Sequence, residues 1–183
     1  MDMVTQAMDG VGSAPGAFGK RIMELADRLA QWSESSDGLT CTYLSPAHRS
    51  VAAEIRNWMR EAGLITEVDA VANVIGRYTA ADPAARTLIL ASHYDTVRNA
   101  GKYDGRLGVL TALMLVEQLK RLGRKLPFHL DVIAFSEEEG VRFSSSFLGS
   151  RAVAGRFDGK LLGRQDPDGH PLETVMRLSL IHI

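Results

Sequence analysis

The chain lacks several features that define large classes of protein. It has one cysteine among 183 residues, Cys41, so an internal disulfide is impossible and a reducing compartment is favoured. No apolar run approaches the ~18 residues of a membrane span, and residues 1–12 do not resemble a signal peptide. The formal net charge of −1 argues against a nucleic-acid or membrane-surface partner. We therefore expect a cytoplasmic protein with no nucleic-acid and no membrane partner.

Familiar catalytic motifs are missing as well. The sequence contains no dinucleotide-binding glycine motif, no phosphate-binding loop of the Walker type and no nucleophile elbow. Four of the five histidines have structural or incidental interpretations. We expect His48 on the surface in the first turn of a helix, His129 in a strand, His170 after a turn and His182 in the C-terminal tail.

What is present is an ordinary globular composition, 45% hydrophobic and 23% charged, in a chain of the size of one domain. Residues 1–16 are small, polar and Gly-rich, and we expect a flexible N-terminal tail there. Residues 17–177 form the folded domain. Residues 178–183 have neither a helix cap nor a polar face, and we expect them to cut off a helix and not to be the native continuation.

Hydrophobic periodicity predicts alternating helices and strands. We expect helices at 17–32, 46–62 and 105–122, and strands at 64–68, 72–78, 87–91 and 128–135. Ser45 and Pro46 make an N-cap and first-turn pair, and Gly63 ends that helix. The continuous apolar runs 87–91 and 128–135 are typical of buried strands, the first of them central. This alternation predicts an α/β domain with a mostly parallel sheet.

Polar side chains follow the two apolar strands. His93 and Asp95 end the first, where side chains two apart point the same way, so Asp95 is placed to orient the His93 imidazole beside a metal. The alternative is an exposed loop histidine and a turn-forming aspartate. Asp104 precedes the long helix, either as a carboxylate that bridges two metal ions or as an N-cap.

The second strand leads into three consecutive glutamates, residues 137–139. Adjacent carboxylates repel one another, and burying them is costly unless cations neutralise them. A divalent metal would do so, with one glutamate as ligand and its neighbour as the general base that takes a proton from water. The alternative is a solvated acidic loop, although the run directly follows a wholly apolar strand.

Together these segments resemble the two-metal amidohydrolases of the aminoacylase and carboxypeptidase superfamily. The resemblance rests on Ser92–Val97, Gly101–Gly105 and Leu107–Leu110, and its branch is indicated by Glu138–Phe143 and Leu148–Arg151. That branch contains allantoate amidohydrolases, N-carbamoyl-L-amino-acid hydrolases and β-ureidopropionases. The sequence of Val97–Tyr103 is most similar to that of allantoate amidohydrolases, since carbamoylases more often carry a proline after the valine that corresponds to Val97.

The resemblance implies a role for each site residue. His93 would ligate one metal, Asp104 would bridge both and Glu139 would ligate the second. Glu138 would be the general base, and Asp95 would support His93. The cofactors would be two divalent ions, Zn²⁺ or Mn²⁺. The fold would be a three-layer, metallopeptidase-like α/β catalytic domain with a mostly parallel mixed sheet, of which residues 17–177 are a part.

The implied activity is hydrolysis of a linear ureido or amide C–N bond in a small molecule, with allantoate giving ureidoglycine, ammonia and carbon dioxide. The family's two further histidine ligands and its inserted dimerisation lid are not in this sequence, and Cys41 stands where the family usually has arginine. We therefore expect the 183-residue chain to be inactive alone, and the full-length form to be a homodimer. N-carbamoyl-L-amino-acid hydrolysis, a related peptidase or deacylase activity, and a non-catalytic metal-binding domain are the alternatives.

Overall fold

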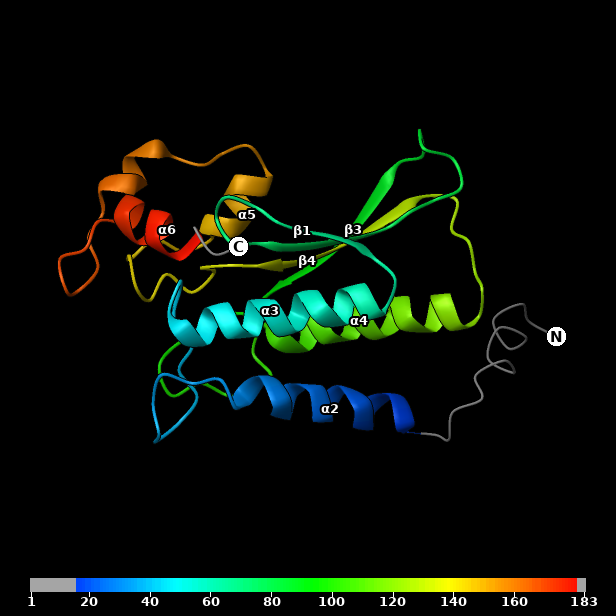
Figure 1. Ribbon diagram of the computed structural model, residues 1–183, viewed down its shortest axis with the longest axis horizontal. Coiled ribbons are helices and arrows are strands. Elements are labelled where there is room, and N and C mark those ends of the chain that lie inside the picture. Colours follow the sequence, from blue (N-terminus) through cyan, green and yellow to red (C-terminus); the bar gives the residue numbers. More distant parts are fainter. Residues whose placement is uncertain (1–15, 181–183) are drawn as a thin grey trace.

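The described part of the chain, residues 16–180 of a computed structural model, is a mixed sheet flanked by helices (Figure 1). The strands are β1 (Ile65–Val68), β2 (Val74–Tyr78), β3 (Thr87–His93) and β4 (His129–Phe135), in the order β1-β2-β4-β3. The helices are α2 (Ala17–Ala30), α3 (Pro46–Glu61), α4 (Arg106–Arg121), α5 (Leu148–Val153), the short 3₁₀ helix η1 (Gly159–Gly163) and α6 (Leu172–Leu180). Apart from Gly16, the expected N-terminal tail lies outside the described residues, as do 181–183.

The sheet confirms the α/β class and is mixed, although parallel pairing does not predominate among the described strands. β3 and β4 pair in parallel, whereas β2 is antiparallel to both β1 and β4. The connections explain this result: the short segment 69–73 joins β1 to an antiparallel neighbour, and a parallel neighbour requires a long crossover such as α4.

The two apolar strands differ in burial. β4 lies in the middle of the sheet and is buried over nearly its whole length, as its sequence predicts. The prediction that 87–91 is a buried central strand is wrong, because β3 is one of the two edge strands of the described sheet. With a partner strand on one side only, β3 leaves Leu88 47% and Ile89 50% exposed.

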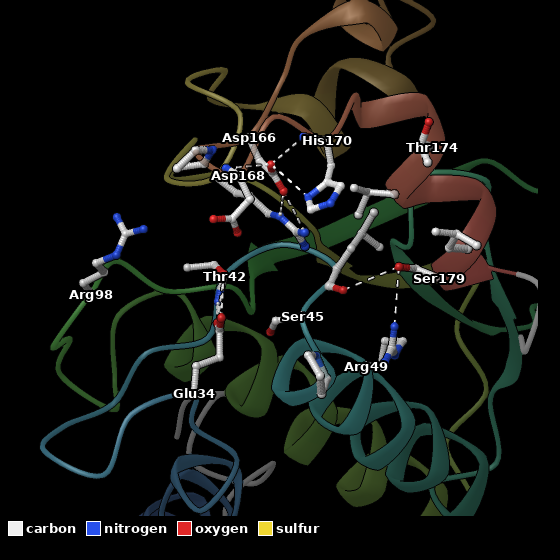
Figure 2. A pocket seen from close by; sticks show the side chains of 16 residues that line it. Glu34, Thr42, Ser45, Arg49, Arg98, Asp166, Asp168, His170, Thr174 and Ser179 are labelled. Carbon is white, nitrogen blue, oxygen red and sulfur yellow. Dashed lines mark hydrogen bonds and ion pairs between the residues drawn. The ribbon is translucent and has the colours of Figure 1, made fainter.

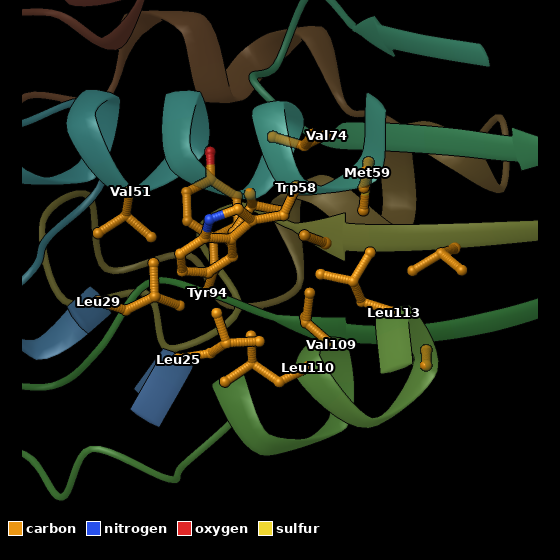
Figure 3. Close-up of a cluster of buried hydrophobic side chains, with 14 of the residues drawn as sticks. Leu25, Leu29, Val51, Trp58, Met59, Val74, Tyr94, Val109, Leu110 and Leu113 are labelled. Atoms are coloured by element: carbon orange, nitrogen blue, oxygen red, sulfur yellow. The ribbon is translucent and has the colours of Figure 1, made fainter. Parts of the chain in front are cut away.

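Helices α3 and α4 pack on one face of the sheet, and α2 packs on α4 (Figure 1). The predicted cap of α3 is confirmed: the Ser45 Oγ accepts the His48 N–H at 3.1 Å, and Pro46 is the first helical residue. Trp58 and Met59 of α3 meet the buried leucines of α4 in the core between helices and sheet (Figure 3).

The prediction that His48 lies on the surface is wrong. Its side chain is fully buried, and its ring stacks on Tyr94 with 4.4 Å between centroids and meets the edge of Tyr43. Residues in the first turn of a helix are often solvated, but here the rings of Tyr43 and Tyr94 cover His48.

The last described helix also differs from its prediction. α6 continues through residues 178–180 and does not end at 177. Ser179 is 4% exposed, and its Oγ lies 3.5 Å from the carbonyl oxygen of Leu44, so this turn of the helix packs on the domain. None of the described helices is long and apolar enough to cross a membrane.

Candidate metal centre

The parallel pairing of β3 and β4 brings the predicted site residues to one edge of the sheet. His93 is in register with Phe135, so the segments that leave both strands emerge side by side. Asp95 and the glutamates 137–139 follow immediately, and Asp104 reaches the same edge from the loop that enters α4. Ligand sites in open α/β sheets lie at the carboxyl ends of the strands, as here.

Three side chains converge as a potential ligand set. His93, Asp104 and Glu139 each offer one atom, and these atoms lie within 4.8 Å of one another. The Nε2 atom of His93 is 3.6 Å from an oxygen of Asp104 and 3.8 Å from an oxygen of Glu138. The N-cap of α4 is Gly105, with no side-chain cap bond, so the Asp104 carboxylate does not serve as the helix cap.

The His93 ring is fixed by backbone groups. Its Nδ1 lies 3.1 Å from the carbonyl oxygen of Asp95, so in the neutral imidazole an N–H at this position donates to that carbonyl and leaves Nε2 free to accept or ligate. Gly105, at φ +62°, lies against the ring, and a Cβ there would be 2.4 Å from His93 Cε1. Only glycine permits this approach.

The Asp95 carboxylate connects the two strand ends. It is 1% exposed, and its Oδ1 and Oδ2 accept the backbone N–H groups of Glu138 and Glu139 at 3.1 and 3.2 Å. Its nearer oxygen is 3.6 Å from the Nδ1 of His93, beyond hydrogen-bonding distance.

The three glutamates do not form a solvated loop. Glu137 has a positive φ of 46° and is fully buried, and one of its carboxylate oxygens accepts the Phe143 N–H at 3.3 Å. Burial, helped by the charge of Asp95, raises the pKa of Glu137 to about 8. Glu138 and Glu139 instead lie toward His93, and the side chain of Glu138 is 30% exposed.

The electrostatics of the centre favour a cation. Burial lowers the pKa of His93, but contact with Asp95 and the charge of Glu138 outweigh it and raise the pKa to about 9. Without a metal, the imidazole is therefore protonated and positively charged at neutral pH. A bound cation would supply this positive charge instead. One imidazole and two carboxylates are also ligands that Zn²⁺ and Mn²⁺ accept, so the residues fit a divalent metal.

A second acidic group lies beside a hollow of about 550 Å³ between α3, α6 and the loop that precedes α6 (Figure 2). Its members are Asp166, Asp168 and His170. Asp166 already accepts the backbone N–H groups of Asp168 and His170 at 3.1 and 2.9 Å and pairs with Arg142 at 3.0 Å. This group is accounted for as the support of a turn.

All five residues singled out in the sequence, His93, Asp95, Asp104, Glu138 and Glu139, meet at this centre. The close approach of Gly105 to the imidazole and the burial of Glu137 were not predicted from the sequence. The Asp-Gly pair before an apolar helix was the signal available for Gly105. Nothing in the local sequence distinguishes the buried Glu137 from the two glutamates that follow it.

Solved structures share the fold of this chain. An amidase of the hydantoinase/carbamoylase family from Burkholderia ambifaria superposes with a TM-score of 0.82 and 30% identity, over 88% of this chain and 40% of that one. A zinc-dependent exopeptidase from Bacteroides vulgatus shares the fold at a TM-score of 0.55 and 16% identity, over 73% of this chain and 51% of that one.

Curated relatives agree with the resemblance found in the sequence. A probable allantoate deiminase of Oryza sativa subsp. japonica is 42% identical over 94% of this chain and 36% of its own length. An N-carbamoyl-L-amino acid amidohydrolase of Geobacillus stearothermophilus is 35% identical over 86% of this chain and 38% of its own. The chain thus spans little more than a third of these relatives. The sequence model of peptidase family M28 matches residues 73–177, more than half of the chain, and the chain therefore belongs to that family.

Proposed function

We propose that this chain carries the first part of the metal site of an amidohydrolase that cleaves a linear ureido C–N bond, with allantoate as substrate. The observation that carries the proposal is the convergence of His93, Asp104 and Glu139 at the carboxyl ends of two parallel strands. In a protein of the relatives' length, hydrolysis of allantoate would give ureidoglycine, ammonia and carbon dioxide.

Each residue then has a distinct task. His93 and Glu139 would each hold a divalent ion, Zn²⁺ or Mn²⁺, and Asp104 would be the carboxylate that both ions share. Bound ions of this kind polarise a substrate carbonyl and make water more acidic. Glu138 is the general base: its carboxylate is partly exposed and 3.8 Å from His93 Nε2, so it can accept a proton from the attacking water and return it to the departing nitrogen.

Support for allantoate comes from the relatives. Allantoate deiminases of Oryza sativa and Arabidopsis thaliana are each 42% identical to the chain, compared with 35% for the Geobacillus stearothermophilus N-carbamoyl-L-amino acid amidohydrolase. Hydrolysis of N-carbamoyl amino acids is the second candidate, supported by the hydantoinase/carbamoylase structures. We also propose a cytoplasmic location, because the single thiol suits a reducing compartment.

Metal binding by the 183-residue chain is the first test. Competition with a chromophoric chelator should show Zn²⁺ or Mn²⁺ binding that is lost in His93→Ala. The matched control is His170→Ala, which removes the histidine of the second acidic group and should bind metal like the unmodified chain. Equal loss in both variants, or equal retention, contradicts the assignment.

Activity is the second test and needs a polypeptide of the relatives' length that contains this chain. Ammonia release from allantoate should exceed that from N-carbamoyl amino acids. Glu138→Gln should keep the metal and lose turnover, whereas Glu67→Gln, an exposed glutamate of β1, should change neither. Turnover that survives Glu138→Gln would refute the assignment of the base.

A further inference from the structure

We propose that Arg106 is a positioning residue of the metal centre: its buried guanidinium ties together the backbone segments that carry His93 and Asp104. This inference rests on the proposed metal site and concerns what holds two of its ligands in place. Arg106 lies in the first turn of α4, yet its side chain is 0% exposed. Arginine is almost never fully buried unless its donors are bound by other groups, so these bonds need an explanation.

The guanidinium joins three elements of the fold. Its Nε donates to the carbonyl oxygen of Tyr94 at 3.1 Å, and its Nη1 donates to that of Leu29 at 3.1 Å. Tyr94 directly follows His93, the last residue of β3, and Leu29 lies in the last turn of α2. One side chain of α4 is therefore bound to the end of β3 that carries the imidazole and to the end of α2.

The backbone of Arg106 lies close to a second ligand. Asp104 is two residues earlier, and the Arg106 N–H donates to the Asp104 carbonyl oxygen at 2.6 Å. Gly105, between them, has a φ of +62° and lies against the His93 ring. A glycine leaves the chain many conformations, so the anchored side chain of Arg106 supplies the fixed point for the start of α4. It thereby sets the place of the Asp104 carboxylate, 3.6 Å from the Nε2 of His93.

The charge of this guanidinium is poorly compensated. Its Nη2 has no hydrogen-bond partner among residues 16–180, and burial lowers the pKa of Arg106, an effect that the neighbouring Cys41 thiol opposes. Burying a charged group is costly, and an apolar side chain of similar size would fill the same volume at a lower cost. What arginine adds is a rigid fork of donors that can bind two carbonyl oxygens at once.

Two variants separate the guanidinium from the volume that it fills. Arg106→Met keeps most of that volume and removes both donors. Cys41→Arg/Arg106→Ala returns a guanidinium from a neighbouring position, because Cys41 lies beside Arg106 and its backbone is bound to Thr96 by two hydrogen bonds. The matched control is Lys120→Met: the Lys120 Nζ donates to the carbonyl oxygen of Glu61 at 2.8 Å, near the opposite end of α4.

The experiment uses the 183-residue chain, with Zn²⁺ and Co²⁺ as probes and circular dichroism to verify folding. We expect Arg106→Met to bind Zn²⁺ roughly tenfold or more weakly, the usual effect of removing the support of a ligand, and Lys120→Met to bind it like the unmodified chain. The visible spectrum of bound Co²⁺ reports ligand geometry, which a loss of stability alone does not alter. It should change in Arg106→Met, and both the spectrum and the Zn²⁺ affinity should recover in Cys41→Arg/Arg106→Ala. Hydrogen exchange of the Arg106 Nε–H, followed by ¹⁵N NMR, should be slow in the unmodified chain.

The outcomes are distinguishable. If the unmodified chain binds no Zn²⁺, the proposed metal site fails, whereas slow exchange of the Arg106 Nε–H still supports the tie between α4 and β3. If the metal binds but Arg106→Met and Lys120→Met have equal affinity, the positioning role is overturned. The same holds if the double variant binds Zn²⁺ no better than Arg106→Met. Fast exchange of the Nε–H in the unmodified chain overturns the role without any variant, so the test holds even if Arg106→Met does not fold.

Discussion

The buried histidine of α3 makes the stability of this domain depend on pH. Complete burial between Tyr43 and Tyr94 lowers the pKa of His48 from 6.5 to about 3. Between these values the unfolded chain binds a proton at His48 and the folded chain does not. The contribution of His48 to stability is therefore complete above pH 6.5 and falls as the pH falls.

The magnitude follows from linkage. One extra proton in the unfolded state changes the free energy of unfolding by about 1.4 kcal/mol for each pH unit. Acidification from about pH 7 to about pH 5 covers some 1.5 units below the unfolded pKa of 6.5, so His48 alone should cost about 2 kcal/mol.

The assay compares His48→Phe with the unmodified chain in urea titrations at about pH 7 and pH 5, in the presence of a chelator. The fluorescence of Trp58, which is 4% exposed, reports unfolding. Phenylalanine keeps an aromatic face for Tyr94 and cannot be protonated, so the variant should gain about 2 kcal/mol relative to the parent on acidification. Tyr43→Phe is the control, because it alters the same contact and keeps the imidazole; its difference from the parent should be the same at both pH values.

The refuting result is specific. If the stability difference between His48→Phe and the parent is equal at the two pH values, the imidazole is not held neutral in the folded state. The burial that the structure gives to the first turn of α3 would then be wrong.

Three further predictions concern the cap, the imidazole support and the metal. Ser45→Ala should lower the free energy of unfolding of the chain by about 1 kcal/mol, measured in urea, and Ser45→Asp should restore most of it. Gly105→Ala should abolish high-affinity Zn²⁺ binding, measured by chelator competition, because its Cβ would overlap the His93 ring; retained affinity would contradict that contact. Zn²⁺ at a hundredfold excess over its Kd should stabilise the chain by about 2.7 kcal/mol, and Glu139→Gln should remove this gain.

Local patterns in the sequence predicted much of this structure. The Ser45-Pro46 pair fixes the start of α3, and the apolar run of β4 marks a buried strand. The site followed from the rule that parallel strands present their carboxyl ends together, which brings His93 and Glu139 into one place.

Other features depend on partners far along the chain. An apolar run has the same composition at the centre and at the edge of a sheet, so the edge position of β3 had no local signal. The burial of His48 depends on Tyr94, 46 positions further along the chain, and that of Glu137 on the loop around Phe143. The predicted roles of Asp95 and Glu138 in catalysis stay predictions until the variants are measured.

The edge position of β3 also affects how the polypeptide behaves at high concentration. Along Thr87–His93 it offers seven residues without an acidic side chain, a lysine, an arginine or a proline, and among the described residues it has a neighbour strand on one side only. Such an edge is a template on which another chain can add a strand. Aggregation of the isolated polypeptide should therefore begin here, and a lysine at Leu88 or Ile89 is the substitution that should suppress it.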